Sequence, residues 1–236
     1  MRGPFGNTDA LGNATGFTGP ALGRQFECVW REAVACLPDF AAYVRNAGIA
    51  NEKGLNGRFS IFLEGRFRRE ELPYLVDKDA MEDEADGRSP APDMGVYIFL
   101  PDSGTARPKI TVIECKRLSS RIGKRREKEY VIGHDREGKH RECGGMERYK
   151  KGLHGREIKV GAMLLAYMQT DGFAVWHERV NGWICELARE RGHSPAWRKD
   201  EMLSDQNVDG IVATSHSRLY RETDQLRLRH IWVDLT

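Results

Sequence analysis

The sequence predicts one α/β domain whose mixed sheet is built in the order helix, three strands, helix, strand, with further helices and a strand added at the ends. Segments 94–100 and 110–114 are rich in β-branched and aromatic residues and flank the turn signal Pro-Asp-Ser-Gly at 101–104, so they predict a hairpin. Ahead of this hairpin, apolar residues recur at helical spacing. With 40% hydrophobic and 31% charged residues, the composition is typical of a folded globular protein.

The N-terminal segment and the cysteines bound the organisation of the chain. Residues 1–20 are rich in Gly, Thr and Asn and lack the apolar core of a secretory signal, so we expect a flexible leader and a single domain at 21–236. No apolar run reaches the roughly 20 residues that a membrane-spanning helix needs. The five cysteines are scattered without a CxxC pair, which favours a reducing compartment. We therefore expect a cytoplasmic protein without membrane association.

Two helical segments are expected before the hairpin. Apolar residues at helical spacing predict a helix over 21–46, which Pro38 should break or kink and which Gly48 should end. Asn51 is a good N-cap residue for a second helix, because its side chain can accept a hydrogen bond from a free backbone amide of the first turn. The apolar stripe of this second helix stops near Arg69.

The rest of the chain continues the alternation of strands and helices. Residues 119–145 are polar, basic and glycine-containing, and predict a long loop or a partly helical excursion. The other expected elements are a short strand (72–77), a short helix (146–153), a buried strand (160–169), a helix (174–191) and a closing strand (225–235).

The chemistry is expected where the second strand of the hairpin ends. Residues two apart on a strand share a face, so Glu114 and Lys116 should emerge together while the Cys115 side chain points to the opposite face. A hairpin turn centred between residues 103 and 104 places Asp93 opposite Glu114. Asp102 also follows a proline but lies in the turn, too far from Glu114 to share a cation with it. Two carboxylates and an ammonium would then meet at one mouth of the hairpin and form a cation site.

These residues resemble a known signature. Pro92-Asp93 before one apolar strand, and Glu114-Cys115-Lys116 at the end of the next, look like the motif of PD-(D/E)XK, or restriction-endonuclease-like, nucleases. The resemblance covers about residues 50–170 and implies the restriction-endonuclease-like core. It also implies that Asp93, Glu114 and the carbonyl of Cys115 bind Mg²⁺ or Mn²⁺, and that Lys116 positions the attacking water or stabilises developing charge. The implied activity is that of a metal-dependent endonuclease, with DNA favoured and a setting in restriction or defence.

Other site residues follow from the same resemblance and from charge. Glu52 opens the helix before the sheet and is the candidate auxiliary acid, with Glu64 as its competitor later in that helix. Basic residues concentrate just after the motif, where they would contact phosphates, and two more lie on the following helix. The expected nucleic-acid-binding residues are Arg117, Arg121, Lys124, Arg125, Arg126, Arg148 and Lys150.

Alternatives remain open from the sequence. Glu114 and Lys116 would also fit a surface ion pair at a strand end, and the basic run a solvated surface. A non-catalytic nucleic-acid-binding subunit of the same fold and an RNA-cleaving toxin are the rival functions, and a homodimer is a candidate assembly. A separate zinc site would use His134, His140, Cys143 and His154, although their spacing matches no standard zinc finger.

Overall fold

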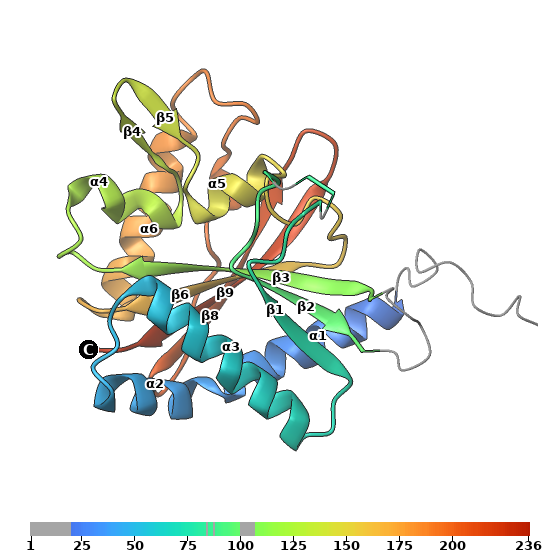
Figure 1. Ribbon diagram of the computed structural model, residues 1–236. Helices are drawn as coiled ribbons and strands as arrows, with labels where there is room; N and C mark the ends of the chain where they lie inside the picture. The colour runs from blue at the N-terminus through green and yellow to red at the C-terminus, as the bar shows by residue number, and fades with distance from the viewer. Residues whose placement is uncertain (1–19, 84, 87, 100–106) are drawn as a thin grey trace, which may run out of the picture.

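The molecule is built on a seven-stranded mixed sheet with the strand order β1-β2-β3-β6-β9-β8-β7 (Figure 1). The structure is a computed structural model of the 236-residue chain, and it describes residues 20–83, 85–86, 88–99 and 107–236. Its strands are β1 (Tyr74–Lys78), β2 (Met94–Ile98), β3 (Lys109–Leu118), β6 (Ala162–Met168), β7 (Asn207–Asp209), β8 (Val212–Tyr220) and β9 (Gln225–Asp234). The chain is therefore an α/β protein with a mixed sheet, as predicted.

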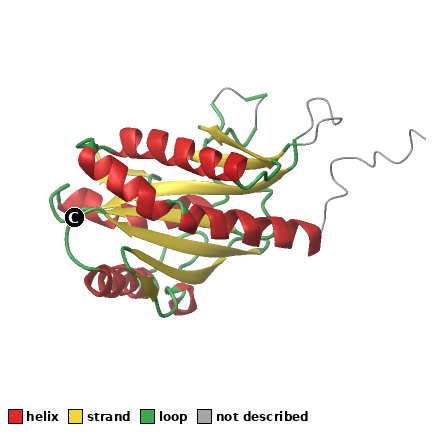
Figure 2. Ribbon diagram, turned by 90° about the horizontal axis from the view of Figure 1, so that it is seen from below, coloured by secondary structure: helices red, strands yellow, loops and turns green. Residues whose placement is uncertain are grey.

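Helices cover both faces of this sheet. In Figure 1, α1 (Pro20–Ala35), α2 (Leu37–Asn46) and α3 (Glu52–Arg69) lie below the strands, and α5 (Gly145–Lys150) and α6 (Phe173–Leu187) lie above them. Figure 2, seen from below, shows the long helices lying across the strands. Five short elements are also present among the described residues: α4 (Lys124–Glu127), the 3₁₀ turns η3 (Lys128–Tyr130) and η4 (Lys199–Glu201), and a separate hairpin of β4 (His134–Arg136) and β5 (Lys139–Arg141).

The predicted helix boundaries before the sheet are confirmed. The expected helix over 21–46 is broken at Cys36. Pro38 lies in the first turn of α2, where a backbone N–H has no acceptor within the helix, so proline costs no hydrogen bond there. Asn51 caps α3, since its side-chain oxygen accepts a 2.8 Å hydrogen bond from the amide of Gly54.

The hairpin register that places the site is also confirmed. Strands β2 and β3 are antiparallel, with Met94 paired to Ile113, and the register shifts only beyond Val96. The residue before Met94 therefore faces Glu114. Residues 100–106, which hold the predicted turn and Asp102, lie outside the described residues.

Two hydrophobic cores lie on the two faces of the sheet, and alternate strand residues enter them. Ile113 and Cys115 pack with α1–α3, whereas Val112 and Leu118 pack with α5 and α6. Glu114 and Lys116 therefore lie on the α5 face, and Cys115 points to the other, as expected. Strand β6 is buried along its whole length because both of its faces are covered, which explains its unbroken apolar sequence.

Some expectations need correction. Strand β3 does not end at Glu114 but continues to Leu118, so the motif lies within the strand. The helix expected over 174–191 ends at Leu187, and the excursion over 119–145 contains α4, η3 and the β4–β5 hairpin. Strands β7 and β8 were not predicted. Most of the predicted leader, residues 1–19, lies outside the described residues.

Within the described ranges, no helix is both long and apolar enough to cross a membrane.

Candidate metal centre

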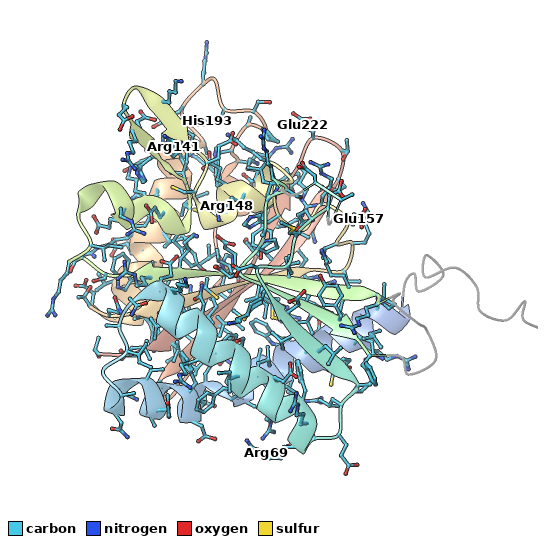
Figure 3. The ribbon with its side chains drawn as sticks, viewed as in Figure 1. Arg69, Arg141, Arg148, Glu157, His193 and Glu222 are labelled. Atoms are coloured by element: carbon cyan, nitrogen blue, oxygen red, sulfur yellow. The ribbon has the colours of Figure 1, made fainter. Side chains whose placement is uncertain are left out.

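Three elements bring the predicted acidic and basic residues together. Asp93 lies immediately before β2, while Glu114 and Lys116 lie on β3. Tyr149 anchors α5 over β3 and its neighbour β6, because its buried hydroxyl lies 2.8 Å from the Met163 carbonyl oxygen of β6 and 3.3 Å from the Val112 carbonyl oxygen of β3. This packing directs the neighbouring Arg148 onto the middle of the sheet, where Figure 3 labels it.

Glu114 is the centre of the cluster. Lys116 Nζ donates to its Oε1 at 2.6 Å, and Arg148 Nη1 donates to the same oxygen at 2.9 Å. The Glu114 side chain is only 1% exposed and that of Lys116 is 8% exposed, so the two do not form a surface ion pair. Burial favours the protonated acid, but Lys116, His154 and Arg148 outweigh it and hold the pKa of Glu114 well below its usual range.

The second oxygen of Glu114 faces His154. His154 Nδ1 lies 2.9 Å from Oε2, but the two atoms do not have hydrogen-bond geometry. Within the part of the chain that is described, neither buried atom has a hydrogen-bond partner. Such unsatisfied buried polar atoms cost free energy, which a bound cation or water would recover.

Asp93 is the second carboxylate of the cluster. Its Oδ2 accepts a 2.7 Å hydrogen bond from the backbone N–H of Cys115 on β3. Burial and the nearby charge of Glu114 raise the pKa of Asp93 to about 7, although Lys116 and the Cys115 N–H oppose them. Unless a metal ion adds positive charge, Asp93 and Glu114 therefore compete for the positive charge of Lys116.

Lys116 remains an ammonium despite its burial. Desolvation lowers its pKa, but Glu114, Glu52 and Asp93 more than offset this and leave the pKa raised. The Cys115 thiol is neutral, since burial raises its pKa well above the ordinary value. That thiol faces away from the cluster, so only the backbone of Cys115 is placed to take part.

Glu52 and Glu64 have different surroundings in the structure. The carboxylate of Glu52 is close enough to contribute to the pKa of Asp93 and of Lys116, and it lies 3.7 Å from Arg117 Nε. Glu64 instead accepts from Arg68 at 2.7 Å and from the amide of Val76 on β1 at 3.1 Å. Glu64 therefore ties α3 to the sheet edge, whereas Glu52 is an acid whose charge acts on Asp93 and Lys116.

Sequence reasoning missed His154 as a neighbour of Glu114. The sequence placed His154 only in an alternative zinc site with His134, His140 and Cys143, and of these four the structure brings together only His134 and Cys143 among the described residues. His154 lies at Glu114, and His140 Nε2 instead lies 2.7 Å from Glu147 Oε1. No local pattern points from His154 to a strand forty positions earlier, so the sequence carried no signal for this contact.

The predicted basic surface is only partly exposed. Arg121 and Arg126 are both exposed, and Arg126 also forms hydrogen bonds with both oxygens of Glu129 at 2.9 to 3.0 Å. Arg117 is directed to Glu52, and Arg148 to Glu114. The side chains of Lys124 and Arg125 lie outside the described residues.

Lys150 does not belong to that surface, which corrects its predicted role. Its side chain is 2% exposed, and Nζ donates to Glu201 Oε1 at 2.5 Å and to the Tyr220 carbonyl at 2.9 Å. Glu201 also accepts from the amides of Arg198 and Tyr220. The pair therefore joins α5 to η4 and β8 inside the protein, away from any phosphate.

Replacing Lys150 should destabilise the fold without acting on the candidate site. We expect Lys150→Met to lower the free energy of unfolding by about 3 to 5 kcal/mol, because it leaves the buried Glu201 carboxylate without its cation. Adding Glu201→Gln should restore part of the loss. The matched control is Lys151→Met, whose side chain is 28% exposed and should matter far less. Urea unfolding measures all three; an unchanged midpoint for Lys150→Met would show that the pair is dispensable.

Comparisons with known proteins add no family to this geometry: no protein-family model, curated protein or solved structure matches the chain.

Proposed function

We propose that this chain is a divalent-metal-dependent nuclease of the PD-(D/E)XK kind, acting on DNA in preference to RNA. The observation that carries the proposal is the convergence of Asp93, Glu114 and Lys116 on adjacent strands of one hairpin. The strand order also supports it. Strands β1, β2 and β3 form an antiparallel meander after α3, and β6 joins β3 in parallel after α5, which is the order expected for a restriction-endonuclease-like core.

The donor set fits a hard divalent cation. Mg²⁺ and Mn²⁺ prefer oxygen ligands, and two carboxylates with a carbonyl suffice when waters fill the other positions. Glu114 Oε2 has no hydrogen bond among the described residues, and Asp93 lies across the hairpin from it. A cation held there would neutralise phosphate charge and supply a metal-bound water of lowered pKa.

Side chains of the protein would supply the contributions to catalysis that the metal ion does not. Lys116, held as an ammonium beside Glu114, would orient the attacking water or stabilise charge that develops on the phosphate. Arg148 is 30% exposed and lies next to the same carboxylate, so it would add positive charge where a phosphate oxygen approaches. Glu52 would serve as a further acid at the rim.

The proposal is tested by incubating the purified protein with plasmid DNA, single-stranded DNA and RNA, in Mg²⁺, Mn²⁺ and chelator. We expect cleavage of DNA that requires the metal, and its loss in Lys116→Met. Because Lys116 is buried, Met is preferred to Ala: it preserves most of the side-chain volume. Metal-dependent cleavage of RNA alone would favour the toxin alternative, and DNA binding without cleavage would favour the non-catalytic subunit. A setting in restriction or defence is a further, family-level proposal.

Arg121, an exposed residue of the basic run, should contribute to binding rather than to the chemistry. We expect Arg121→Gln to weaken DNA binding for all sequences and to reduce the salt dependence by about one unit of slope, because one phosphate contact is lost. The control is Arg69→Gln, an exposed arginine that Figure 3 places at the far end of α3. Fluorescence anisotropy at several salt concentrations measures both; equal slopes for the two variants would contradict the assignment.

A further inference from the structure

A second cluster of metal-binding side chains lies in the excursion between β3 and β6. Glu129 belongs to η3, His134 begins β4, and Cys143 follows β5. One ligand atom from each lies within 4.8 Å of the others. None of the three was needed for the proposed nuclease chemistry, and they come from segments on both sides of the β4–β5 hairpin.

The distances between these atoms match those around a tetrahedral zinc ion. Zinc binds sulfur at about 2.3 Å and nitrogen or oxygen at about 2.0 to 2.2 Å, so tetrahedral ligands stand roughly 3.3 to 3.6 Å apart. His134 Nδ1 lies 3.1 Å from Glu129 Oε1 and 3.5 Å from Cys143 Sγ, and the sulfur lies 4.0 Å from Glu129 Oε1. Small side-chain rotations would bring all three pairs into range.

A catalytic thiol relay does not account for the arrangement. In a relay, the imidazole contacts the nucleophile through one ring nitrogen and the acid through the other. Here Cys143 and Glu129 both approach Nδ1 of His134, so the three groups converge on a single point.

The backbone is shaped to bring the ligands together. Gly133 immediately precedes His134, and Gly144 immediately follows Cys143. At these two glycines the segments on either side of the hairpin approach each other closely. A Cβ added to Gly133 would lie 1.7 Å from the Arg141 carbonyl oxygen, and one added to Gly144 would lie 2.4 Å from the Ile132 Cα. Only glycine fits at this approach, so the sequence maintains the convergence of His134 and Cys143.

The β4–β5 hairpin is short and mostly exposed. Each of its strands has three residues, and every residue from Lys139 to Arg141 is exposed. An isolated two-stranded hairpin is at best marginally stable in water. A cross-link between η3, β4 and the segment after β5 would fix it, and a metal ion supplies such a cross-link in small or exposed substructures.

We propose that Glu129, His134 and Cys143 bind one zinc ion, with water in the fourth position. A thiolate, an imidazole and a carboxylate form a donor set of mixed softness that suits zinc better than Mg²⁺. The two anions would balance the ion's charge once the thiol proton is released. Arg126 holds the Glu129 carboxylate through both oxygens and orients it as an outer-shell partner.

This zinc site would also position a residue of the candidate metal centre. Arg148 Nε donates to the carbonyl of Glu142, the residue before Cys143, at 3.0 Å, while its Nη1 donates to Glu114. Fixing Cys143 therefore fixes one of the two anchors of Arg148. The zinc proposal does not depend on the nuclease proposal, because zinc binding is measured without any activity.

The test is metal analysis of the full chain. Protein saturated with Zn²⁺ and passed over a desalting column should retain one zinc per chain, and Co²⁺ should give thiolate-to-cobalt charge-transfer absorption. Cys143→Ser and His134→Gln should lose both signals. Cys185→Ser and His140→Gln are the matched controls, since neither residue is in the cluster, and both should retain them.

Three results would overturn the proposal: no retained zinc in the wild-type protein, zinc retained in Cys143→Ser, or zinc lost in either control variant. Asp93→Asn separates the two sites. It should keep the zinc and the cobalt spectrum, whereas loss of both would place the ion at the other centre. Limited proteolysis gives an independent readout, because zinc should slow cleavage within 134–143 in the wild-type protein but not in Cys143→Ser.

Discussion

Asp93→Asn should abolish metal-dependent DNA cleavage, with a loss of at least about a thousandfold in rate, because an amide is a poor ligand for Mg²⁺ where a carboxylate is required. The substitution keeps the side-chain volume, and the Asn oxygen can still accept the hydrogen bond from the Cys115 amide. Asp102→Asn is the control, since it is the other aspartate that follows a proline in this hairpin. Cleavage assays with both variants decide the assignment. Loss of activity in Asp102→Asn alone would mean that the metal-binding aspartate had been misidentified.

The same substitution should stabilise the metal-free protein. At pH 8 the wild-type Asp93 carboxylate is ionised although its pKa is raised to about 7, so burial and Glu114 make its charge unfavourable. Removing that charge should raise the free energy of unfolding in chelator by roughly 1 to 3 kcal/mol. Thermal unfolding at pH 8 measures the change. A less stable variant would indicate that the carboxylate contributes to folding rather than to function.

The second large effect is an acid-dependent loss of stability at His230. This residue on β9 is fully buried, and burial, followed by the charges of His216 and His177, lowers its pKa from 6.5 to about 3. The unfolded chain therefore binds a proton more readily than the folded chain. The stabilising contribution of neutral His230 is complete above about pH 6.5 and is lost as the pH falls toward 3. The total loss of stability over this range is roughly 4 to 5 kcal/mol.

The hydrogen bonds around His230 explain why its charge is excluded. Trp232 Nε1 donates to the Tyr130 hydroxyl at 2.8 Å, so that hydroxyl donates its own proton to His230 Nδ1 at 2.7 Å. The opposite ring nitrogen, Nε2, then donates to Ser217 Oγ at 2.9 Å. A proton on Nδ1 would leave two donors facing the Tyr130 oxygen and its own hydrogen without an acceptor.

Urea unfolding of the wild type and of His230→Gln between pH 4 and pH 8 measures this contribution. The stability of the wild type should fall more steeply with decreasing pH than that of the variant, because only the wild type gains the unfavourable proton. Absolute stabilities are not compared, since Gln does not fill the same volume. Parallel curves would show that His230 is protonated without cost in the folded protein.

Much of the fold was predictable because it depends on neighbours close in sequence. The cap at Asn51 and the break near Pro38 follow from the chemistry of one or two residues. The continuous apolar run predicted the buried strand β6. The hairpin register followed from the turn position, and with it the convergence of Asp93 and Glu114. Each of these features depends on a short stretch of sequence: a capping or breaking residue, one apolar run, or a hairpin whose two strands follow each other in the chain.

The contacts that complete both sites could not be predicted in this way. Arg148 and His154 reach Glu114 only because α5 packs across β3, and Glu129 joins His134 and Cys143 only because η3 lies beside the hairpin. Lys150 looks like a surface cation in the sequence, but η4 and β8 cover it and supply Glu201 as its partner.

By itself, the sequence determined the α/β class, the hairpin and the group of Asp93, Glu114 and Lys116. The tertiary structure alone decided which cations surround Glu114, which basic residues remain exposed and which acid completes the second cluster. The physical reason is the distance along the chain over which each effect acts. Backbone periodicity fixes the directions of side chains within an element, whereas their partners depend on which elements pack together, and that is set by burial of apolar surface over the whole chain.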